Sequence, residues 1–437
     1  MVTARSVALE ALVACEKQGA WSDGYLKKAI RAAGLDARDA ALATRLCFGV
    51  LQNRMLLDFW LSDLCLTPLE KLEPPVRAVL RLGAYQLQLL SRVPSHAAVS
   101  QAVDLARKYA RNPRAAGLVN GVLRNLLRQK DRLPSPSDLS TRYSHPQWLV
   151  DAFAERLGAE ETEALLAADN GEPPTCAQVN TLKTTPEALS AALAARGVEA
   201  GPHPWLPGCL LLRRTGSLEE LPEFQAGHFY IQDAAARLSV LAAAPQPGWR
   251  VLDACAAPGG KSFAAALAMG DRGEVLSCDI HPHKQQLIQA GARRLGLSCI
   301  HTEVLDARMC KDDLLGRFDL VIADVPCSGL GIIRKKPDIR YKDPKPLENL
   351  PKIQADILDN AARCVCPGGV LLYATCTLLE RENEGAVLGF LDRNKHFTLE
   401  RFQVPGPFAD TGRGMLTCWP HRHGTDGFFF AKLRRTL

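Results

Sequence analysis

The sequence lacks several patterns that would assign it to a common class. It has no apolar run long enough to cross a membrane, which excludes a helical membrane protein. It has no G-x-G-x-x-G pattern, so a dinucleotide fold with that fingerprint is excluded. Its fourteen cysteines form no C-x-x-C pair. In a chain of 437 residues, this distribution indicates reduced thiols in a cytoplasmic protein rather than a disulfide framework.

One stretch comes close to a phosphate-binding loop and misses it by one residue. Gly260, Lys261 and Ser262 match the end of the P-loop pattern G-x-x-x-x-G-K-[ST], whose first glycine lies five residues before the second. That position is occupied by Cys255, and a side chain there obstructs the tight wrap of backbone around a phosphate. A P-loop ATPase is therefore disfavoured, and we expect this turn to hold a different ligand.

Positive charge is concentrated near the N-terminus. Residues 1–150 hold 21 Lys and Arg against 12 Asp and Glu, whereas the remaining 287 residues hold 32 against 35. A basic module joined to a nearly neutral one is typical of a polyanion-docking domain that serves a catalytic domain. The first twenty residues alternate like an amphipathic helix and carry Glu10 and Glu16, which argues against a signal or transit peptide.

Residues 1–132 are predicted to form an all-helical domain. Apolar residues recur at helical spacing in at least five segments, and breakers such as Pro94 and Pro113 separate these segments. Short connections favour a compact bundle. The last two expected helices carry basic side chains that we expect to form a phosphate-facing surface, namely Arg107, Lys108, Arg111, Arg114, Arg124 and Arg128.

A linker and a small mixed subdomain are expected next. Residues 133–148 contain three prolines and several serines, which is typical of a linker. Residues 149–237 are predicted to form an α+β subdomain that positions the substrate, beginning with a helix over Leu149–Ala168. Its strands are expected at Thr175–Leu182, Cys209–Leu212 and His228–Gln232.

Residues 238–437 alternate strands and helices in the order that builds a Rossmann-like, mostly parallel α/β sheet. Strands are expected at Arg250–Ala254, Glu274–Asp279, Cys299–Leu305, Asp319–Ala323 and Val370–Ala374. The stretch Thr417–Arg435 is predicted to form an antiparallel edge hairpin around a Gly-Thr-Asp-Gly turn.

Carboxylates recur at the carboxyl ends of the expected parallel strands, where open sheets bind ligands. Asp279 lies twenty residues after Gly259, where an acidic residue usually accepts hydrogen bonds from ribose hydroxyls. A single aspartate of this kind more often caps a turn. Four of them, however, lie at successive strand ends, namely Asp253, Asp279, Asp306 and Asp324, and coincidence is a poor explanation for that. Without a glycine wrap for polyphosphate, S-adenosylmethionine fits this nucleoside site better than ATP or NAD. The candidate cofactor-binding residues are Cys255, Ala256, Ala257, Pro258, Gly259, Gly260, Lys261, Asp279, Asp306 and Asp324.

Three blocks of sequence resemble the signature blocks of RNA cytosine-5 methyltransferases, the NOL1/NOP2/Sun family. These blocks are DACAAPGGKS, DVPCSGLGIIRKKPDIR and LLYATCTLLERENE. The segments VPSHAAVSQAV and GLVNGVLRNLL also resemble the RNA-binding helical domain of the antitermination factor NusB. With YSHPQWLV and the terminal DGFFFAKL, the resemblance spans nearly the whole chain. The sequence departs from the usual pattern at Thr377, where serine is usual, and at Gln178, where arginine is expected; the block QDAAA, which starts at Gln232, also lacks the usual serine.

The resemblance implies an enzyme that transfers a methyl group from S-adenosylmethionine to C5 of a cytosine in bacterial 16S ribosomal RNA. We expect a monomer without an obligate protein partner, a membrane or a metal. The target base must leave its stack to reach the active site, which fits a cytosine in single-stranded or looped RNA.

Such an enzyme needs a cysteine thiolate, because C5 of cytosine is a poor nucleophile while the ring is aromatic. Addition of a thiolate to C6 makes C5 enamine-like, and loss of the C5 proton later expels the thiol. Cys327 and Cys376 lie at predicted strand ends, and residue chemistry alone does not rank them. The family resemblance makes Cys376 the nucleophile and Cys327 the group that assists adduct release. Analogy with DNA cytosine-5 methyltransferases would instead make Cys327 the nucleophile. We prefer the first assignment because both blocks match the RNA family.

Asp324, beside the Pro-Cys pair, is expected to hold the amino edge of the cytosine, and Lys261 to neutralise developing charge. A ribosome-assembly factor that has lost catalysis is the competing hypothesis, and the intact thiols and aspartates argue against it. Cys418, His421 and His423 have a loose metal-like spacing, but no second cluster matches them, so we expect no zinc site.

Overall fold

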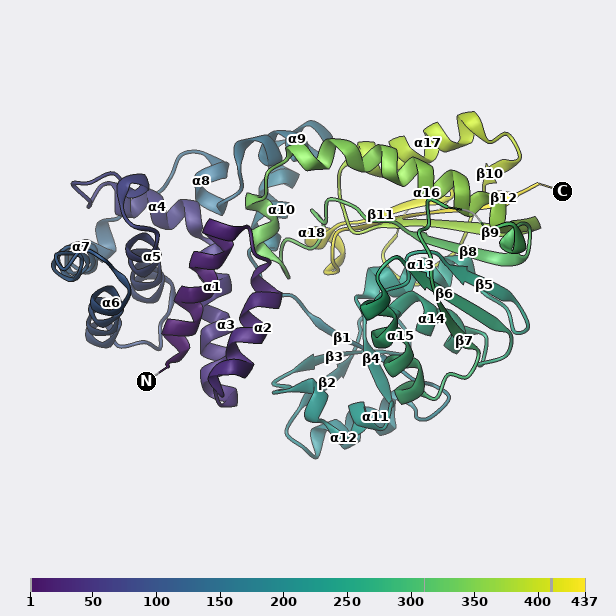
Figure 1. The fold of residues 1–437 in the computed structure, drawn as a ribbon, viewed down its shortest axis with the longest axis horizontal. Coiled ribbons are helices and arrows are strands. Elements are labelled where there is room, and N and C mark those ends of the chain that lie inside the picture. Colours follow the sequence, from purple (N-terminus) through teal and green to yellow (C-terminus); the bar gives the residue numbers. More distant parts are fainter. Residues whose placement is uncertain (1, 310, 409–411, 437) are drawn as a thin grey trace. The chain divides into compact units, whose positions relative to one another are not determined.

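The computed structural model describes residues 2–309, 311–408 and 412–436, and the chain divides into two compact units. Unit 1 comprises Met1–Gly171 together with Ile333–Lys342. Unit 2 comprises Glu172–Ile332 and Asp343–Leu437. Figure 1 shows unit 1 as purple and blue helices together with a short green segment from the last third of the sequence.

Unit 1 is helical, as the spacing of apolar residues predicts. Its helices are α1 (Ala4–Gln18), α2 (Ser22–Ala33), α3 (Ala37–Gln52), α4 (Arg54–Ser62), α5 (Pro74–Leu89), α6 (Ser95–Tyr109), α7 (Ala115–Arg128), α8 (Leu139–Tyr143), α9 (Gln147–Leu157) and α10 (Ala159–Asp169). Local chemistry sets the ends of α1: Thr3 and Ser6 form a capping box, and Gly19 ends the helix with φ of 61°. The apolar faces of α1 to α7 share one hydrophobic core.

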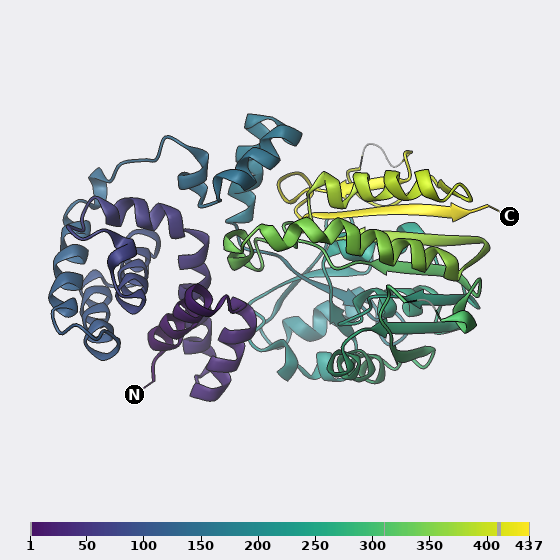
Figure 2. The ribbon, with the colours of Figure 1, turned by 45° about the horizontal axis from the view of Figure 1, so that its top comes forward.

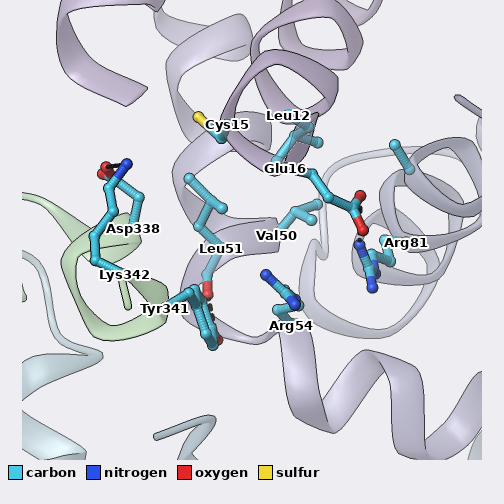
Figure 3. A pocket seen from close by; sticks show the side chains of 11 residues that line it. Leu12, Cys15, Glu16, Val50, Leu51, Arg54, Arg81, Asp338, Tyr341 and Lys342 are labelled. Carbon is cyan, nitrogen blue, oxygen red and sulfur yellow. Dashed lines mark hydrogen bonds and ion pairs between the residues drawn. The ribbon is translucent and has the colours of Figure 1, made fainter. Parts of the chain in front are cut away.

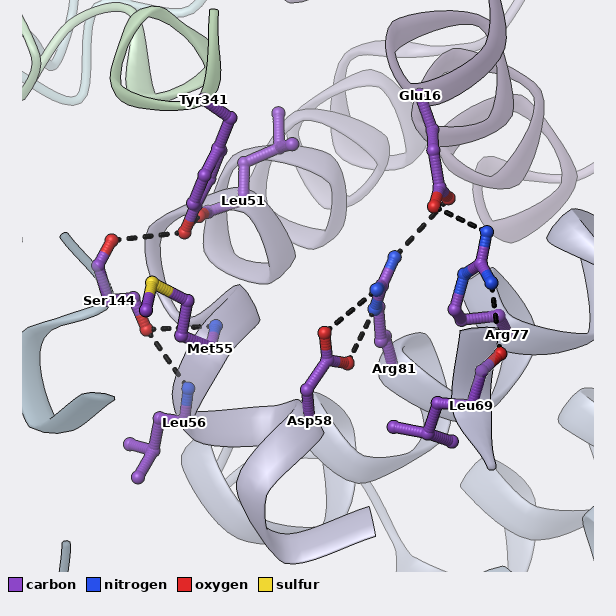
Figure 4. Close-up of polar contacts among 10 residues, drawn as sticks. All are labelled: Glu16, Leu51, Met55, Leu56, Asp58, Leu69, Arg77, Arg81, Ser144 and Tyr341. Carbon is purple, nitrogen blue, oxygen red and sulfur yellow. Dashed lines mark hydrogen bonds and ion pairs between the residues drawn. The ribbon is translucent and has the colours of Figure 1, made fainter. Parts of the chain in front are cut away.

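The segment 133–148, treated above as a linker, contains α8 and ends in well-packed residues. Ser144 and His145 are fully buried, and the Ser144 hydroxyl accepts hydrogen bonds from the Met55 and Leu56 backbone nitrogens, both at 3.1 Å (Figure 4). This hydroxyl therefore caps the first turn of α4. The single helix expected over Leu149–Ala168 is in fact two, α9 and α10, because Gly158 interrupts it with φ of 76° and ψ of 174°.

Residues Ile333–Lys342, here called the inserted segment, belong to unit 1 although they follow the Pro-Cys block of unit 2 in sequence. Arg340 in this segment is fully buried and donates to the Asn170 side chain at 2.8 Å and to the Ser144 carbonyl at 3.2 Å. The Tyr341 hydroxyl donates to the Leu51 carbonyl at 2.9 Å and to the Ser144 carbonyl at 3.1 Å (Figure 4). The inserted segment is thus bonded to α3 and to the α8–α10 region.

Unit 2 begins with a small antiparallel sheet in the order β2-β3-β1-β4. Its elements are β1 (Thr175–Val179), α11 (Pro186–Ala194), β2 (Glu199–Pro202), β3 (Cys209–Arg213), α12 (Pro222–Gln225) and β4 (Phe229–Ile231). A small core forms between the sheet and α11, where Val179, Leu189, Leu193 and Phe229 are buried. The expected α+β fold is confirmed for this part of the chain, but the helical region 149–168, which was expected to begin the subdomain, forms α9 and α10 and belongs to unit 1.

The larger sheet of unit 2 has the order β10-β12-β9-β8-β5-β6-β7, and β5 to β9 run parallel. Its elements are α13 (Ala234–Ala243), β5 (Arg250–Asp253), α14 (Gly260–Ala268), β6 (Glu274–Asp279), α15 (Pro282–Leu295), β7 (Ile300–Val304), β8 (Phe318–Asp324), α16 (Leu350–Cys364), β9 (Val365–Thr375), α17 (Glu384–Arg393), β10 (Phe397–Leu399), β11 (Met415–Cys418), α18 (Pro420–His423) and β12 (Phe428–Arg435). Figure 1 shows α13–α15 on one face and α16 and α17 on the other. Each face has its own hydrophobic core, and the predicted Rossmann-like, mostly parallel α/β sheet is confirmed.

The C-terminal hairpin differs in two ways from the expectation. The helix α18 lies between β11 and β12, so the connection is longer than a Gly-Thr-Asp-Gly turn. β12, the long yellow strand in Figure 2, is not an edge strand, because it pairs with β9 on one side and with β10 and β11 on the other. Phe428 and Phe430 are buried in the core on one face of the sheet, and Phe429 is buried in the core on the other. Across the described residues, no helix is long and apolar enough to cross a membrane.

Candidate active site

The candidate site lies where the parallel sheet reverses its order. The chain enters at β5, continues outward through β6 and β7, and then crosses to β8 and β9 on the other side. In sheets of this kind, the crevice beyond the carboxyl ends at the reversal point takes the ligand. Residues that end or follow β5, β6, β7 and β8 line a cavity of about 360 Å³ there.

Acidic side chains mark two strand ends on the cavity wall. Asp279 ends β6, and its Oδ1 accepts from the His281 backbone nitrogen at 2.9 Å and lies 3.9 Å from the Lys284 ammonium. Asp306 follows β7, and both its oxygens accept from the Arg308 guanidinium, at 2.6 Å for the shortest bond. These bonds lower the pKa of Asp306, so it is ionised at neutral pH. Both side chains therefore offer acceptor oxygens to a hydroxylated ligand.

Much of the remaining wall is apolar. Ile353 and Ile357 are one turn apart on α16 and reach the cavity together, whereas Ile280 follows Asp279 and is 47% exposed. Val325 and Pro326 contribute from the loop after β8. An apolar slot beside hydrogen-bonding carboxylates suits the flat base and polar sugar of a nucleoside.

The predicted cofactor-binding residues divide into two groups. Those on the cavity wall are Cys255, Ala257, Asp279, Asp306 and Asp324. Those that do not line it are Ala256, Pro258, Gly259, Gly260 and Lys261. Gly259 acts on the turn itself: its φ is 110°, and a Cβ there would lie 2.5 Å from the Phe263 ring. Only glycine fits that conformation, which turns the chain from β5 into α14.

Sequence reasoning missed a second set of wall residues, namely Ile280, His281, Lys284, Arg308, Val325, Pro326, Ile353 and Ile357. The position of Ile280 directly after Asp279 was one available signal. Ile353 and Ile357 have helical spacing, which by itself is the spacing of an ordinary core face. No local pattern distinguishes them.

The structure brings the two candidate thiols together. Cys327 lies in the loop after β8, Cys376 follows the end of β9, and their sulfur atoms are 3.2 Å apart. The backbone aligns these loops, because the Val325 nitrogen donates to the Ala374 carbonyl and the Gly331 nitrogen donates to the Cys376 carbonyl. The hydrogen bond with Cys376, and then burial, raise the pKa of Cys327 well above its usual range. Cys327 therefore keeps its proton at neutral pH.

Lys261 reaches the same region from the first turn of α14. Its ammonium lies 2.6 Å from Oδ2 of Asp324 and 4.9 Å from the centre of the Phe428 ring. Below it, the fully buried Asp253 accepts from the Ser262 hydroxyl at 2.7 Å. Burial raises the pKa of Asp253 to about 7. Of the four candidate catalytic residues, Asp324, Cys327 and Cys376 thus lie at or just after the ends of the neighbouring strands β8 and β9, and Lys261 reaches Asp324 from α14.

The predicted RNA-contacting residues all lie in unit 1, on α6, α7 and the turn between them. Arg107, Lys108, Arg111, Arg114, Arg124 and Arg128 are exposed. Arg107 forms an exposed ion pair with Asp104 at 3.1 Å, and such a pair is readily exchanged for an external phosphate. The six basic side chains are accessible to a polyanion.

A second cavity, of about 200 Å³, lies within unit 1 (Figure 3). Arg81 donates to Asp58 at 2.7 and 2.8 Å and lies 3.3 Å from Glu16. The Arg54 guanidinium stacks over the Tyr341 ring at 4.5 Å. Because these charged groups are engaged with one another, we assign this cavity to the packing of unit 1.

The Cys418-to-His423 stretch is engaged in packing. Cys418 is buried in β11, and Nδ1 of His423 accepts from the Trp419 backbone nitrogen at 2.8 Å. The His423 ring also packs against Phe408, with 4.7 Å between ring centres. Within residues 2–309, 311–408 and 412–436, no three His, Cys, Asp or Glu side chains group as metal ligands.

Comparison with known families gives matches along the chain. The family model described as 16S rRNA methyltransferase RsmB/F matches residues 240–434, the NusB family model matches residues 2–128, and the model of an RsmF/B-like ferredoxin-like domain matches residues 145–219. The last two correspond to α1–α7 and to the segment that contains α9, α10 and β1–β3.

Individual relatives match over most of their length. The chain is 38% identical to the probable ribosomal RNA small subunit methyltransferase B of Bacillus subtilis, over 99% of this chain and 98% of that protein. It is 34% identical to the ribosomal RNA small subunit methyltransferase B of Salmonella arizonae, over 91% of this chain and 90% of that protein. The crystal structure titled PH0851 is similar over 100% of this chain and 99% of that chain, with 25% identity and a TM-score of 0.83.

Proposed function

This chain belongs to the 16S rRNA methyltransferase RsmB/F family, and from that premise we propose that it methylates C5 of a cytosine through a covalent bond between Cys376 and C6 of the base. The observation that carries this proposal is the 3.2 Å separation of the Cys327 and Cys376 sulfur atoms. Cys327 directly follows Pro326, which lines the 360 Å³ cavity.

S-adenosylmethionine is the proposed donor, and the cavity residues fit it. Asp279 would accept hydrogen bonds from the ribose hydroxyls, because its second oxygen, Oδ2, has no hydrogen-bond partner in the described parts of the chain. Ile280, Ile353 and Ile357 would hold the adenine between apolar side chains. When bound, this group supplies a methyl attached to a positively charged sulfur.

Cys376 is the proposed nucleophile. Its thiolate adds to C6 and breaks the aromaticity of the ring, so that C5 becomes able to attack the methyl carbon. After C5 has taken the methyl group and S-adenosylhomocysteine has been released, water accepts the C5 proton, which restores the aromatic ring and expels the Cys376 thiolate. Cys327, which keeps its proton, would donate a hydrogen bond to that sulfur as it leaves C6.

Asp324 and Lys261 would orient the cytosine. Oδ2 of Asp324 is held by the Lys261 ammonium at 2.6 Å, and its Oδ1 has no hydrogen-bond partner among the described residues. That oxygen would accept a hydrogen bond from the exocyclic amino group of the base. The ammonium, 7% exposed, would stabilise the negative charge that the ring gains when the thiolate adds.

The exposed basic side chains of α6 and α7 would bind phosphates of the 16S RNA, and the target base would turn out of its stack into the site. Replacing the six by Gln should flatten the slope of log affinity against log salt by about 0.7 for each phosphate that is no longer neutralised. Affinity for S-adenosylmethionine, measured by calorimetry, should stay the same. An unchanged slope would remove these helices from the proposed RNA surface. The substrate and the need for two reduced thiols make the cytoplasm the proposed location.

The main test combines product mapping with trapping of the covalent adduct. The protein is incubated with methyl-labelled S-adenosylmethionine and 16S RNA, and mass spectrometry maps the modified nucleotide. Label in one 5-methylcytosine is expected, and its absence would favour an assembly factor without catalysis.

Cysteine variants test the two roles. On denaturing gels, Cys327→Ala is expected to accumulate a protein–RNA adduct, whereas Cys376→Ala forms none. The opposite pattern would exchange the two roles. Cys366→Ala is the matched control, because this half-buried cysteine lies near the start of the same strand, β9, and should behave like the wild type.

A further inference from the structure

The two loops that carry the thiols are joined one residue beyond each thiol. Ser328 follows Cys327 and Thr377 follows Cys376, and their hydroxyl oxygens are hydrogen-bonded at 2.6 Å. Thr377 is fully buried and Ser328 is 8% exposed. In that environment the bond is protected from water and fixes the distance between the loops.

Glu382 and Gln354 together hold the residues on both sides of Cys327. Glu382 lies in the turn Glu380–Glu382 after β9 and is fully buried. One of its oxygens, Oε2, accepts from the Ser328 backbone nitrogen at 3.0 Å and from the Gln354 amide at 2.8 Å. The same Gln354 amide donates to the Pro326 carbonyl at 3.0 Å. Gln354 is therefore bonded to the residue before Cys327, and Glu382 to the residue after it.

The next residue, Asn383, does the same for Cys376. Its side-chain oxygen accepts from the Thr375 hydroxyl at 2.6 Å, and its amide donates to the Thr377 carbonyl at 3.0 Å. All three residues are fully buried. Two consecutive residues thus hold the neighbours of the two thiols, one thiol each.

We propose that Glu382 and Asn383 are positioning residues that keep the two sulfur atoms at their working separation, and that the charge of Glu382 keeps the thiol proton on Cys327. This inference rests on the proposed function, because it assigns different tasks to the two thiols. It adds residues that do not themselves touch the base or the methyl donor.

The electrostatics support the role of Glu382. A buried carboxylate disfavours a second negative charge nearby, and Glu382 contributes to raising the pKa of Cys327, after the bond with Cys376 and burial. Tyr373 interacts electrostatically with Cys327, Glu382 and Asp324, and Asp324 is paired with the Lys261 ammonium. The second oxygen of Glu382, Oε1, is buried without a hydrogen-bond partner among the described residues. Such an arrangement is costly for stability alone, which favours a functional reason for the charge.

Glu382→Gln separates charge from geometry. The amide oxygen can take the place of Oε2 and keep both hydrogen bonds, while the negative charge is lost. Alkylation of each cysteine is measured by peptide mass spectrometry across a pH series, in the full chain without RNA or methyl donor. We expect the midpoint for Cys327 to fall by about one pH unit. The control Glu384→Gln, two residues away and bonded to Thr417, should leave this midpoint unchanged.

The hydroxyl bridge and Asn383 are tested by kinetics. Thr377→Val and Asn383→Ala should each lower kcat about tenfold, the size of one lost hydrogen bond to the thiol loops, with little change in KM for S-adenosylmethionine. Thr377→Ser, which keeps the hydroxyl, should restore kcat.

Failure of this inference is distinguishable from failure of the proposed function. An unchanged Cys327 midpoint in Glu382→Gln, or full activity in Thr377→Val, would overturn the inference while the wild type still methylates RNA. A wild type that neither methylates RNA nor forms an adduct would overturn the proposed function, whatever the alkylation midpoints are.

Discussion

The two cavities differ in what their charged groups bind. In unit 1, Arg81 is bonded to Asp58 and Glu16, so the charges around the cavity of about 200 Å³ neutralise one another. In unit 2, Asp279 and Asp324 each have one engaged oxygen and one without a hydrogen-bond partner among the described residues, beside a cavity of about 360 Å³. The number of charged residues is therefore a poor guide to a binding site. A better indicator of a binding site is a carboxylate with one oxygen bonded within the protein and the other oxygen available to a ligand.

The largest expected effect would show that the unit 1 cavity is structural. Arg81 is 6% exposed, and Arg81→Met leaves Asp58 and Glu16 without their shared cation. The free energy of unfolding of unit 1 should fall by about 3 to 5 kcal/mol, measured by denaturant titration. Arg107→Met, in an exposed pair with Asp104, should cost less than about 1 kcal/mol. If Arg81→Met instead weakened binding of S-adenosylmethionine with unchanged stability, the contrast between the cavities would be wrong.

An intermediate effect tests the unit 2 cavity. Asp279→Ala removes the proposed ribose acceptor and should raise the Kd for S-adenosylmethionine about 100-fold, as measured by calorimetry. Asp279→Asn should lose less, because one acceptor oxygen remains. The control is Asp392→Ala, an exposed aspartate on α17 that should leave Kd unchanged. If Asp279→Ala bound S-adenosylmethionine as tightly as the wild type, the ribose would have to bind elsewhere in the cavity.

The smallest effect concerns Asp253, a carboxylate that neither cavity uses. Burial raises its pKa from 3.8 to about 7, so the folded protein retains a proton that the unfolded chain has lost. The resulting stability is fully present below about pH 4 and is lost as the pH rises through 7. Between pH 6 and pH 8 the free energy of unfolding of unit 2 should therefore fall by about 1 kcal/mol. Asp253→Asn should remove this dependence, and a wild-type stability that rises over this interval would contradict the assignment.

The sequence predicts well what local pattern controls. Alternating strand and helix periods predicted β5 to β9, and the rule that ligands bind at strand ends predicted the neighbourhood of Asp279, Asp306 and Asp324. The family blocks predicted the thiol pair that is 3.2 Å apart. Each of these features depends on a few consecutive residues.

What escaped prediction depends on contacts between distant residues. Ser328 and Thr377 are separated by 49 positions, and no local sequence pattern predicts the hydrogen bond between their side chains. Ile353 reaches the cavity because α16 packs on β8, and its spacing is that of any core helix. β12 became an interior strand because short strands pair with its outer side, and a hairpin pattern does not reveal its neighbours.

The inserted segment also constrains how this protein can be made. Arg340 and Tyr341 are bonded to Asn170, Ser144 and Leu51, so the N-terminal unit is complete only with residues encoded far downstream. During synthesis, the helices of this unit emerge from the ribosome well before the segment that finishes their packing. A gene cut after α10 would yield an N-terminal fragment that lacks the buried Arg340, and the separately expressed C-terminal half would carry the inserted segment without the helices that it packs against.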